Sequence, residues 1–558
     1  MSRIVGIDLG TSTSEIGCIV DGTARLIPNS QGRLITPSVV HIGQEGEILV
    51  GEEAAEYLFT RPDSTFMEVK RLTGSGEKLR AHGKEYDPEE IQAMLLRYLV
   101  RCAEDCLEEK INRAVITVPA YFTDVQRRAT AKAGELAGLQ VERIINEPTA
   151  AALDYGLSNL KECKNVLVYD LGGGTLDVTV LELFEGVIDV KASSGNNHLG
   201  GKDFDEIIMG RLADPAGDER ALMRLKKAAE ECKIALSVQE ELRVSLPFLL
   251  TGKDGKPVSV EQTVSRADFE RWVWGKVQTA REPMLSALAD AKVSREDLQV
   301  ILLVGGSTRI PCVKRLVEET LGAAPRSLVD PDLTVARGAA IQAGLIEGSI
   351  NNEDLVLTDV CPYTLGTAPL RDGFFSHQLV FDPLIPRNTT IPVEKTKLYT
   401  TAADYQTEVV IDVFQGESTD PKNNEQLGEL RLSGIPPARQ GKEQIEVSFG
   451  YDMNGILQVK AQVVSTGKAV SADISTTGIK ARPALDLSKW EQAAGARAFR
   501  PLIRKAEKII AAGLDIGGDV SLLAGQIKEA LVLNKGEQAE EYREALRDMI
   551  GTLEKIDK

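Results

Sequence analysis

Two apolar runs of the sequence end in aspartate, and each is followed at once by glycine and hydroxyl residues. The first ends at Asp8 in IDLGTS, and the second ends at Asp170 in YDLGGGT. A second β-prone run follows each turn, so both stretches predict a strand–turn–strand hairpin. Glycines let backbone amides converge on an anion, and a neighbouring carboxylate can hold a hydrated divalent cation. The repeat therefore indicates a duplicated fold with two facing halves, each offering one phosphate-gripping hairpin.

Length and composition narrow the class of protein further. A chain of 558 residues is too long for one hydrophobic core, so several domains are expected. The formal net charge of −18 argues against nucleic-acid binding. The sequence contains neither a P-loop motif nor an apolar run long enough to span a membrane, and no signal peptide is expected, because the start MSRIVGIDLG enters a strand at once. Cys102 and Cys106 have a spacing that could suit a metal, but free thiols in a reducing cytoplasm are the favoured reading.

The hydrophobic period changes twice along the chain. Strand and helix signals mix up to about residue 350, and Gly, Ser, Asn and acids predominate from Gly348 to Asp354. The short apolar run that follows, from Leu355 to Asp359, is expected to be a linker or an edge strand. The period next becomes two, which predicts an all-β domain with a hairpin turn at Asn454-Gly455, and it finally returns to 3.6. Within the first part, residues 75–88 are expected to form a loop, and Asp330 and Asp332 are expected to cap the helix at 335–345.

A set of longer motifs resembles the seventy-kilodalton heat-shock chaperone family, the DnaK-like proteins. In chain order these are GIDLGTS (6–12), VKRLTG (69–74), VPAYFTD (118–124), RIINEPTAAALDYG (143–156), YDLGGGTLDV (169–178), HLGGKDFD (198–205), VGGSTRIP (304–311), DPDLTVARGAAIQAG (330–344), RNTTIP (387–392) and QGE (415–417). The resemblance implies a multidomain fold in which an α/β actin-like ATPase domain of two lobes precedes an all-β sandwich and a small helical lid. The corresponding boundaries are 1–350 for the ATPase domain, 351–360 for the linker, 361–482 for the peptide-binding sandwich and 483–558 for the truncated lid.

The chain also departs from the family pattern. The segments after Lys70 and after Asp205 are short, the helical end is truncated, and Thr358 stands in the linker where the family usually has leucine. These departures resemble the short, specialised bacterial members of the HscC type.

The resemblance implies an ATP/ADP site. Catalytic roles would fall to Lys70, Glu147, Thr175 and Asp177, which would reach the γ-phosphate or order the attacking water. Asp8 and Asp170 would hold Mg²⁺ through water, with K⁺ as a further candidate cation. The nucleotide would be held by Gly10, Thr11, Ser12, Gly172, Gly173, Gly174, Thr175, Gly200, Gly201, Glu230, Lys233, Ser237, Gly305, Gly306, Ser307, Arg309 and Asp332.

The resemblance also implies coupling to a second site. Pro119 and Arg127 resemble the relay that reports nucleotide state, while Val409 and Ile411 match pocket positions for an extended apolar peptide. Tyr399 and Phe374 are weaker peptide-binding candidates. The implied function is that of a cytoplasmic ATP-dependent chaperone with unfolded client polypeptides, a J-domain cochaperone and an exchange factor as partners, and with neither nucleic acid nor membrane among them.

Other classes share the duplicated nucleotide core. A sugar or acetate kinase would need an acceptor site between the lobes and no β-sandwich, and an actin-like filament protein would lack the C-terminal third. A nucleotide-binding cochaperone that acts as an exchange factor with little hydrolysis is the more serious alternative. The presence of Lys70, Glu147, Thr175 and Asp177 argues for hydrolysis.

Overall fold

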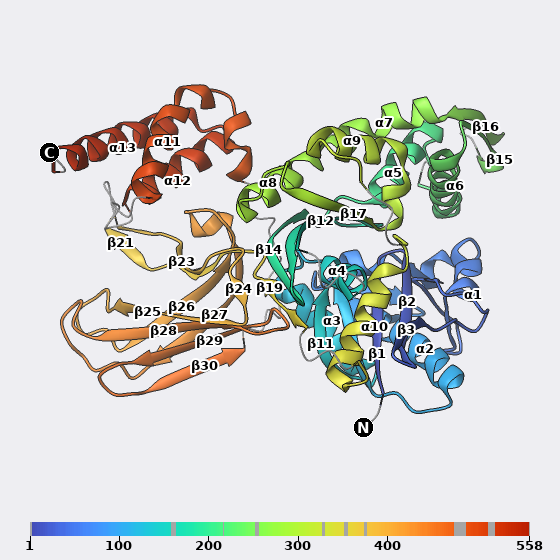
Figure 1. The fold of residues 1–558 in the computed structure, drawn as a ribbon, viewed down its shortest axis with the longest axis horizontal. Coiled ribbons are helices and arrows are strands. Elements are labelled where there is room, and N and C mark those ends of the chain that lie inside the picture. The colour runs from blue at the N-terminus through green and yellow to red at the C-terminus, as the bar shows by residue number, and fades with distance from the viewer. Residues whose placement is uncertain are drawn as a thin grey trace. The chain divides into compact units, whose positions relative to one another are not determined.

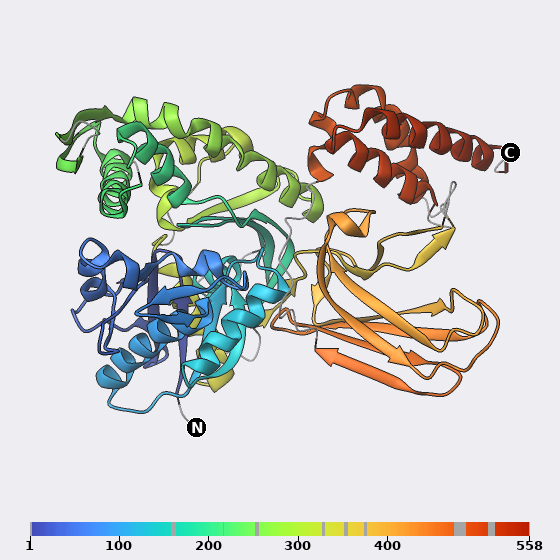
Figure 2. The ribbon, with the colours of Figure 1, turned by 180° about the vertical axis from the view of Figure 1, so that it is seen from behind.

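The computed structural model describes residues 3–157, 163–215, 217–251, 256–325, 330–350, 355–372, 377–473, 487–511 and 519–556 (Figures 1 and 2). The chain divides into two units. The first comprises Met1–Pro362 with the turn Met453–Ile456, and the second comprises Tyr363–Asp452 with Leu457–Lys558.

Two sheets organise the first unit. The first has the strand order β11-β10-β1-β2-β3, with β4 paired to β2, and the second has the order β17-β12-β13-β14-β18. The bounds in the first sheet are β1 Ile4–Leu9, β2 Thr13–Val20, β3 Thr23–Leu26, β4 Thr36–Pro37, β10 Arg113–Val118 and β11 Gln140–Asn146. Those in the second are β12 Lys164–Leu171, β13 Leu176–Phe184, β14 Val187–Asn196, β17 Leu298–Val304 and β18 Val356–Leu357.

The two sheets repeat one topology. In each, an antiparallel hairpin (β1–β2 or β12–β13) continues into a third antiparallel strand, and a later strand (β10 or β17) pairs in parallel beside the first. The duplication predicted from the two Asp-Leu-Gly turns is thereby confirmed, because both turns fall at the same place in the repeat.

Helices cover the sheets and bury their apolar faces. They are α1 Glu52–Ala55, α2 Pro88–Leu107, α3 Asp124–Leu136, α4 Glu147–Leu157, α5 Gly201–Leu212, α6 Glu219–Val238, α7 Arg266–Gln278, α8 Arg281–Ala291, α9 Pro311–Leu321 and α10 Thr334–Glu347. Helix α10 lies so close to β1 that a Cβ at Gly6 would meet the backbone of Ala339 at 2.2 Å. Glycine is therefore required where this helix crosses the strand.

Two local predictions in the first unit are wrong. The expected loop at 75–88 contains a short hairpin, β8 Leu79–Ala81 and β9 Lys84–Tyr86, whose central residues His82 and Gly83 have φ of 49° and 76°. Positive φ at both central positions is the hairpin turn that matches strand twist, and a His-Gly pair is an easily missed signal for it. Neither Asp330 nor Asp332 caps α10 with its side chain, because Leu333 is the N-cap residue and the Thr334 amide donates to the backbone carbonyl of Asp330.

Smaller elements complete the first unit. These are the sheet β6-β5-β7, with β5 Val39–Ile42, β6 Ile48–Val50 and β7 Thr65–Met67, the hairpin of β15 Glu241–Thr251 and β16 Pro257–Ser265, the strand β19 Asp359–Val360 and the 3₁₀ turns η3 Val69–Leu72 and η4 Gly306–Arg309. No helix among the described residues is long and apolar enough to cross a bilayer.

The second unit combines two sheets with a helical bundle. The sheet orders are β23-β20-β26-β27 and β25-β28-β29-β30. The bounds are β20 Leu365–Thr367, β23 Asp382–Ile385, β24 Thr390–Ile391, β25 Val393–Thr400, β26 Glu408–Gln415, β27 Glu425–Ser433, β28 Gln444–Tyr451, β29 Leu457–Val463 and β30 Ala469–Asp473, with a separate hairpin of β21 Leu370–Asp372 and β22 His377–Leu379. Buried and exposed residues alternate along β29, as the period-two pattern predicts, and Asn454-Gly455 lies in the turn between β28 and β29.

The helices α11 Arg500–Ala511, α12 Asp519–Val532 and α13 Gly536–Ile556 share a hydrophobic core of their own. Trp490, Phe499 and Ile527 are among the buried residues of that core. The period of 3.6 in the sequence therefore identified a genuine bundle.

Candidate functional site

Three glycine turns of the second sheet and its connections pack against one another. The Gly201 amide donates to the Gly172 carbonyl at 3.0 Å, and the Ser307 hydroxyl donates to the same carbonyl at 2.8 Å. A Cβ at Gly200 would lie 2.5 Å from the backbone of Gly173, and one at Gly305 would lie 2.4 Å from a neighbouring carbonyl oxygen. The glycines at 172–174, 200–201 and 305–306 thus form a closely packed cradle, in which a side chain at Gly173, Gly200, Gly201 or Gly305 would clash with a neighbouring segment.

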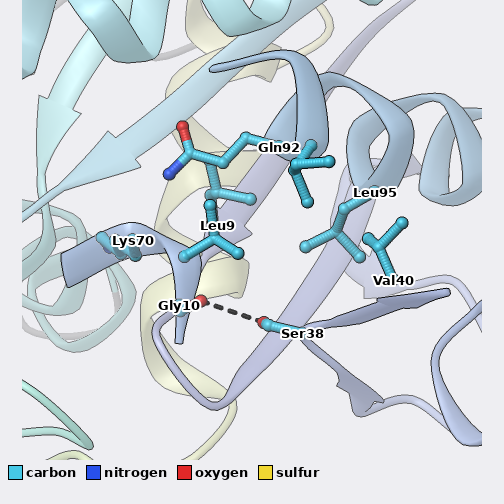
Figure 3. Close-up of a pocket in the computed structure, with 9 residues that line it drawn as sticks. Leu9, Gly10, Ser38, Val40, Lys70, Gln92 and Leu95 are labelled. Atoms are coloured by element: carbon cyan, nitrogen blue, oxygen red, sulfur yellow. Dashed lines mark hydrogen bonds between the residues drawn. The ribbon is translucent and has the colours of Figure 1, made fainter. Parts of the chain in front are cut away.

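The turn of the first sheet meets this cradle. A Cβ at Gly173 would lie 2.3 Å from the Ser12 hydroxyl, and one at Gly174 would lie 3.1 Å from the Thr11 hydroxyl. The Gly10 carbonyl accepts a hydrogen bond of 2.9 Å from Ser38, beside a small cavity that Lys70 also lines (Figure 3). The two Asp-Leu-Gly turns therefore face each other, as the duplicated sequence predicts.

A buried ion pair lies beside the two turns. Lys70 comes from the 3₁₀ turn η3 and Glu147 is the first residue of α4, and their Nζ and Oε1 atoms are 2.5 Å apart. Their side chains are only 6% and 11% exposed. A lysine so deeply buried is not a solvated surface charge, which agrees with its assignment to the site rather than to an exposed face.

Three aspartates surround this pair. Asp170 and Asp177 are direct partners across the β12–β13 hairpin, so their side chains lie on one face of the sheet. The Tyr121 amide donates to Asp177 Oδ1 at 2.9 Å, whereas Asp177 Oδ2 is buried and has no hydrogen-bond partner among the described residues. Asp8 Oδ1 accepts a hydrogen bond of 2.7 Å from the Thr117 hydroxyl.

Burial and the nearby Glu147 carboxylate raise the pKa of each aspartate. Burial, assisted by the Glu147 carboxylate, raises the pKa of Asp8 to about 6 and that of Asp177 to about 7. The pKa of Asp170 is well above its usual value for the same two reasons. Lys70 opposes all three rises, but one lysine cannot neutralise this many carboxylates. The surplus of buried acidic oxygens fits a hydrated divalent cation, whose ligands are oxygen atoms.

No three acidic, histidine or cysteine side chains in the described part of the chain are close enough together to hold a metal ion directly. A cation held through water needs no such group, and water-mediated binding is what the family resemblance implies for Asp8 and Asp170.

The predicted adenosine side of the site is held by ion pairs between α5 and α6. Lys202 contacts Glu230 at 2.9 Å, and Lys233 contacts Asp205 at 2.8 Å. The Ser237 hydroxyl donates to a carbonyl of its own helix at 2.9 Å. These contacts fix one side of α6 against the helix that begins at the glycine cradle.

The other residues predicted for the adenosine side lie on η4 and on the segment before α10. Arg309 contacts Asp332 at 2.6 Å, and a Cβ at Gly306 would lie 3.2 Å from Asp332 Oδ1. The structure therefore brings the predicted pair Arg309 and Asp332 together beside the third glycine turn.

Sequence reasoning missed several residues of the site. Glu15 is the cross-strand partner of Asp8, is 2% exposed, and has one carboxylate oxygen without a hydrogen-bond partner. Thr117, the donor to Asp8, is a polar residue inside an otherwise apolar strand, and that irregularity could have identified it.

The two relay candidates are buried next to this site. Pro119 follows β10, and Arg127 of α3 is 3% exposed. Arg127 Nη2 donates to Asn146 Oδ1 at 2.7 Å, and Asn146 Nδ2 donates to Asp359 Oδ2 at 2.8 Å. The guanidinium is thus connected to the segment that ends the first unit.

The peptide-binding candidates lie in the second unit, on one strand of each of its two larger sheets. Val409 is half-buried and Ile411 is buried on β26, while Tyr399 lies on β25 of the other sheet. The Tyr399 hydroxyl donates to Asp382 Oδ2 at 2.8 Å, so it is engaged within the unit. Phe374 and residues 351–354 of the predicted linker lie outside the described residues.

Comparisons with known proteins agree with the site. The model of the "Hsp70 protein" family matches residues 4–80 and 76–508. The chaperone protein DnaK of Thermotoga petrophila is 48% identical over 480 residues, which cover 84% of this chain and 79% of the relative. DnaK of Thermosipho melanesiensis is 47% identical over 484 residues (85% and 80%), and DnaK of Mycoplasmopsis pulmonis is 48% identical over 474 residues (83% and 77%).

The fold and the site thus define a nucleotide-dependent chaperone ATPase. The chain belongs to the Hsp70 family and is DnaK-like, an ATP-dependent chaperone. The closer resemblance to the short HscC type stays a prediction.

Proposed function

We propose that ATP hydrolysis at the paired glycine turns controls the affinity of the β-sandwich for extended apolar segments of unfolded proteins. The proposed domains are an actin-like, two-lobed ATPase domain at 1–350, a linker at 351–360, a peptide-binding sandwich at 361–482 and a truncated lid at 483–558. The repeated sheet topology of the first unit supports the two-lobed assignment. The observation that carries the proposal is the buried Lys70–Glu147 pair among Asp8, Asp170 and Asp177, beside two facing glycine turns.

The residues present fit ATP or ADP with a hydrated Mg²⁺. The amides of Gly173 and Gly174 would meet phosphate oxygens, since those of Gly172, Gly200, Gly201 and Gly305 already donate to protein oxygens. The surplus of carboxylates suits a cation. Asp8 and Asp170 would hold the cation through water, with K⁺ as a further candidate. When bound, the cation would offset the negative charge that shifts onto the phosphate oxygens during hydrolysis.

The other polar residues would position the phosphates and the attacking water. Lys70, oriented by Glu147, would direct its ammonium protons to a phosphate oxygen. Asp177 Oδ2 has no protein partner and would accept a hydrogen bond from the attacking water. Thr175, in the turn between these groups, would add its hydroxyl to the same water network.

The base and ribose would be held by α6 and by η4. Glu230, Lys233 and Ser237 lie on α6, and Arg309 and Asp332 lie on the other side of the third glycine turn. When the nucleotide binds, these side chains would replace some of their hydrogen bonds and ion pairs within the protein with hydrogen bonds to the base or the ribose.

Coupling would run from this site to the sandwich. The Arg127–Asn146–Asp359 hydrogen bonds support a path from the relay candidates to the linker. Val409 and Ile411 on β26 would contact the peptide, with Tyr399 as a weaker candidate. We further infer a cytoplasmic protein whose partners are client polypeptides, a J-domain cochaperone and an exchange factor.

Single-turnover ATP hydrolysis tests the assignment of the site. Lys70→Ala should slow hydrolysis by about 100-fold or more, because a charge-stabilising donor is lost beside a phosphate. Lys78→Ala is the matched control, since Lys78 pairs with Asp87 on the surface of the same lobe and should leave the rate unchanged. A rate insensitive to Lys70→Ala would contradict the assignment and favour the alternative of an exchange factor with little hydrolysis.

Peptide binding measured in ATP and in ADP tests the coupling separately. We expect weak, fast peptide binding in ATP and tight, slow binding in ADP. Equal affinities in the two nucleotides would leave an ATPase without the proposed coupling.

A further inference from the structure

Near the end of the first unit, a short strand is attached to the edge of the second sheet. Strand β18 pairs in parallel with β14, where the Val356 amide donates to Gly186 at 3.1 Å and the Thr358 amide donates to Ile188 at 3.0 Å. The strand is two residues long, and Val356 is 51% exposed. Backbone pairing of so short an edge strand gives little local stability by itself.

The Thr358 side chain adds a second attachment at the end of this strand. The Val190 amide donates to the Thr358 hydroxyl at 3.2 Å, and the hydroxyl donates to Asp189 Oδ1 at 2.6 Å. The hydroxyl thus accepts a hydrogen bond from Val190 and donates one to Asp189, two adjacent residues of β14. The leucine that the family usually has at this position could make neither bond.

Asp189 is itself held in place for this contact. Its other oxygen, Oδ2, accepts from Lys191 Nζ at 2.5 Å, and Lys191 also pairs with Glu182 at 2.9 Å. A hydroxyl that donates to an ionised, pre-oriented carboxylate makes a stronger hydrogen bond than one that donates to a neutral acceptor. The hydrogen bonds of the Thr358 hydroxyl to Asp189 and Val190, called the clasp, therefore hold the segment on the sheet edge.

The next residue joins the clasp to the relay candidates. Asp359 is 6% exposed, and its Oδ2 accepts from Asn146 at 2.8 Å and from Thr149 at 3.2 Å. Release of the segment would also break these hydrogen bonds, so Asp359 adds a further attachment, to β11 and α4, beside the Thr358 clasp on the sheet edge.

We propose that Thr358 is a release catch, in which the clasp on Asp189 and Val190 sets how readily residues 355–360 leave the sheet edge. The catch itself is a property of the ligand-free protein. Only its control by nucleotide rests on the proposed function.

Hydrogen exchange of the full-length protein, followed by mass spectrometry without nucleotide, measures this release directly. Thr358→Val keeps the shape of the side chain and removes its hydroxyl, so exchange in 355–360 should become about 5- to 20-fold faster. Thr358→Ser keeps a hydroxyl and should restore the slow exchange. Asp189→Ala removes the acceptor, and its effect should not add to that of Thr358→Val because both break the same contact.

Thr279→Val is the matched control. Its hydroxyl donates to the Lys276 carbonyl at 2.7 Å at the end of α7 and does not contact β18, so exchange in 355–360 should match that of the wild type. Exchange in the central strand β12 should stay unchanged in every variant, which shows that the unit remains folded. Unchanged exchange in Thr358→Val, or no recovery in Thr358→Ser, would overturn the catch.

Repeating the measurement in ATP and ADP separates the two proposals. A wild type that protects 355–360 equally in both nucleotides would refute nucleotide control of the segment. The difference between Thr358→Val and Thr358→Ser in the ligand-free protein would still decide the catch.

Discussion

Asp177→Asn should change the pH dependence of stability of the ligand-free first unit. Burial raises the pKa of Asp177 from 3.8 to about 7, and the side chain is only 1% exposed, so solvent screens the effect little. The variant retains an oxygen that can accept from the Tyr121 amide, which preserves the observed hydrogen bond. The change therefore removes a titrating charge and keeps the shape of the site.

The magnitude follows from the shift in pKa. Three pKa units at 1.36 kcal/mol each amount to about 4 kcal/mol. Because the folded pKa lies above the unfolded one, the wild type loses this free energy of unfolding as the pH rises from about 4 to 7. Below pH 4 the carboxyl is protonated in both states, and above pH 7 the loss is complete. The new amide adds a pH-independent offset, because its nitrogen would lack a partner.

Scanning calorimetry without nucleotide, from pH 4 to pH 8, measures this difference. Between pH 4 and pH 8, the free energy of unfolding of the variant should rise by about 4 kcal/mol relative to that of the wild type. For a unit of this size, this change corresponds to about 5 °C in the difference between the two Tm values. Asp105→Asn replaces an exposed aspartate of α2 and should show a flat difference. A gap for Asp177→Asn that is equally flat would refute the reasoning.

Two further substitutions, one in each unit, test a close backbone contact and a side-chain hydrogen bond. Gly338→Ala should lower the free energy of unfolding by about 1–3 kcal/mol, because a Cβ there would lie 1.8 Å from a carbonyl oxygen of α4. Gly210→Ala is the control, with no atom within 4 Å of the added Cβ, and equal Tm values for the two variants would contradict this account. Glu529→Gln should speed amide exchange about 10-fold in the loop of Ser418, whose hydroxyl donates to Glu529 at 2.8 Å. The exposed Glu544→Gln on α13 should have no effect, and a loop equally protected in both variants would show that Glu529 does not hold it.

Local patterns carried most of the fold prediction. The two Asp-Leu-Gly turns identified the duplicated hairpins, and the changes of period located the sheets and the helical bundle, because both signals depend on neighbouring residues alone. The errors were local too. The polar pattern around the His-Gly turn predicts a loop, where the structure has a hairpin. The sequence also predicts Asp330 and Asp332 as helix caps, whereas Asp332 pairs with Arg309. A side chain that can cap a helix can equally bind a distant partner, and only packing decides between them.

The sequence by itself determined which segments form strands, turns and helices, and motif resemblance named the glycines, Lys70, Glu147 and the aspartates of the site. Only the tertiary structure decided which of these groups meet. Glu15 faces Asp8 because of the register of β1 and β2, and Lys202 and Asp205 reach α6 because α5 packs against it. The same is true of the Thr358 clasp, whose partners lie 168 and 169 residues away along the chain. Such contacts depend on strand register and packing, which no local pattern encodes.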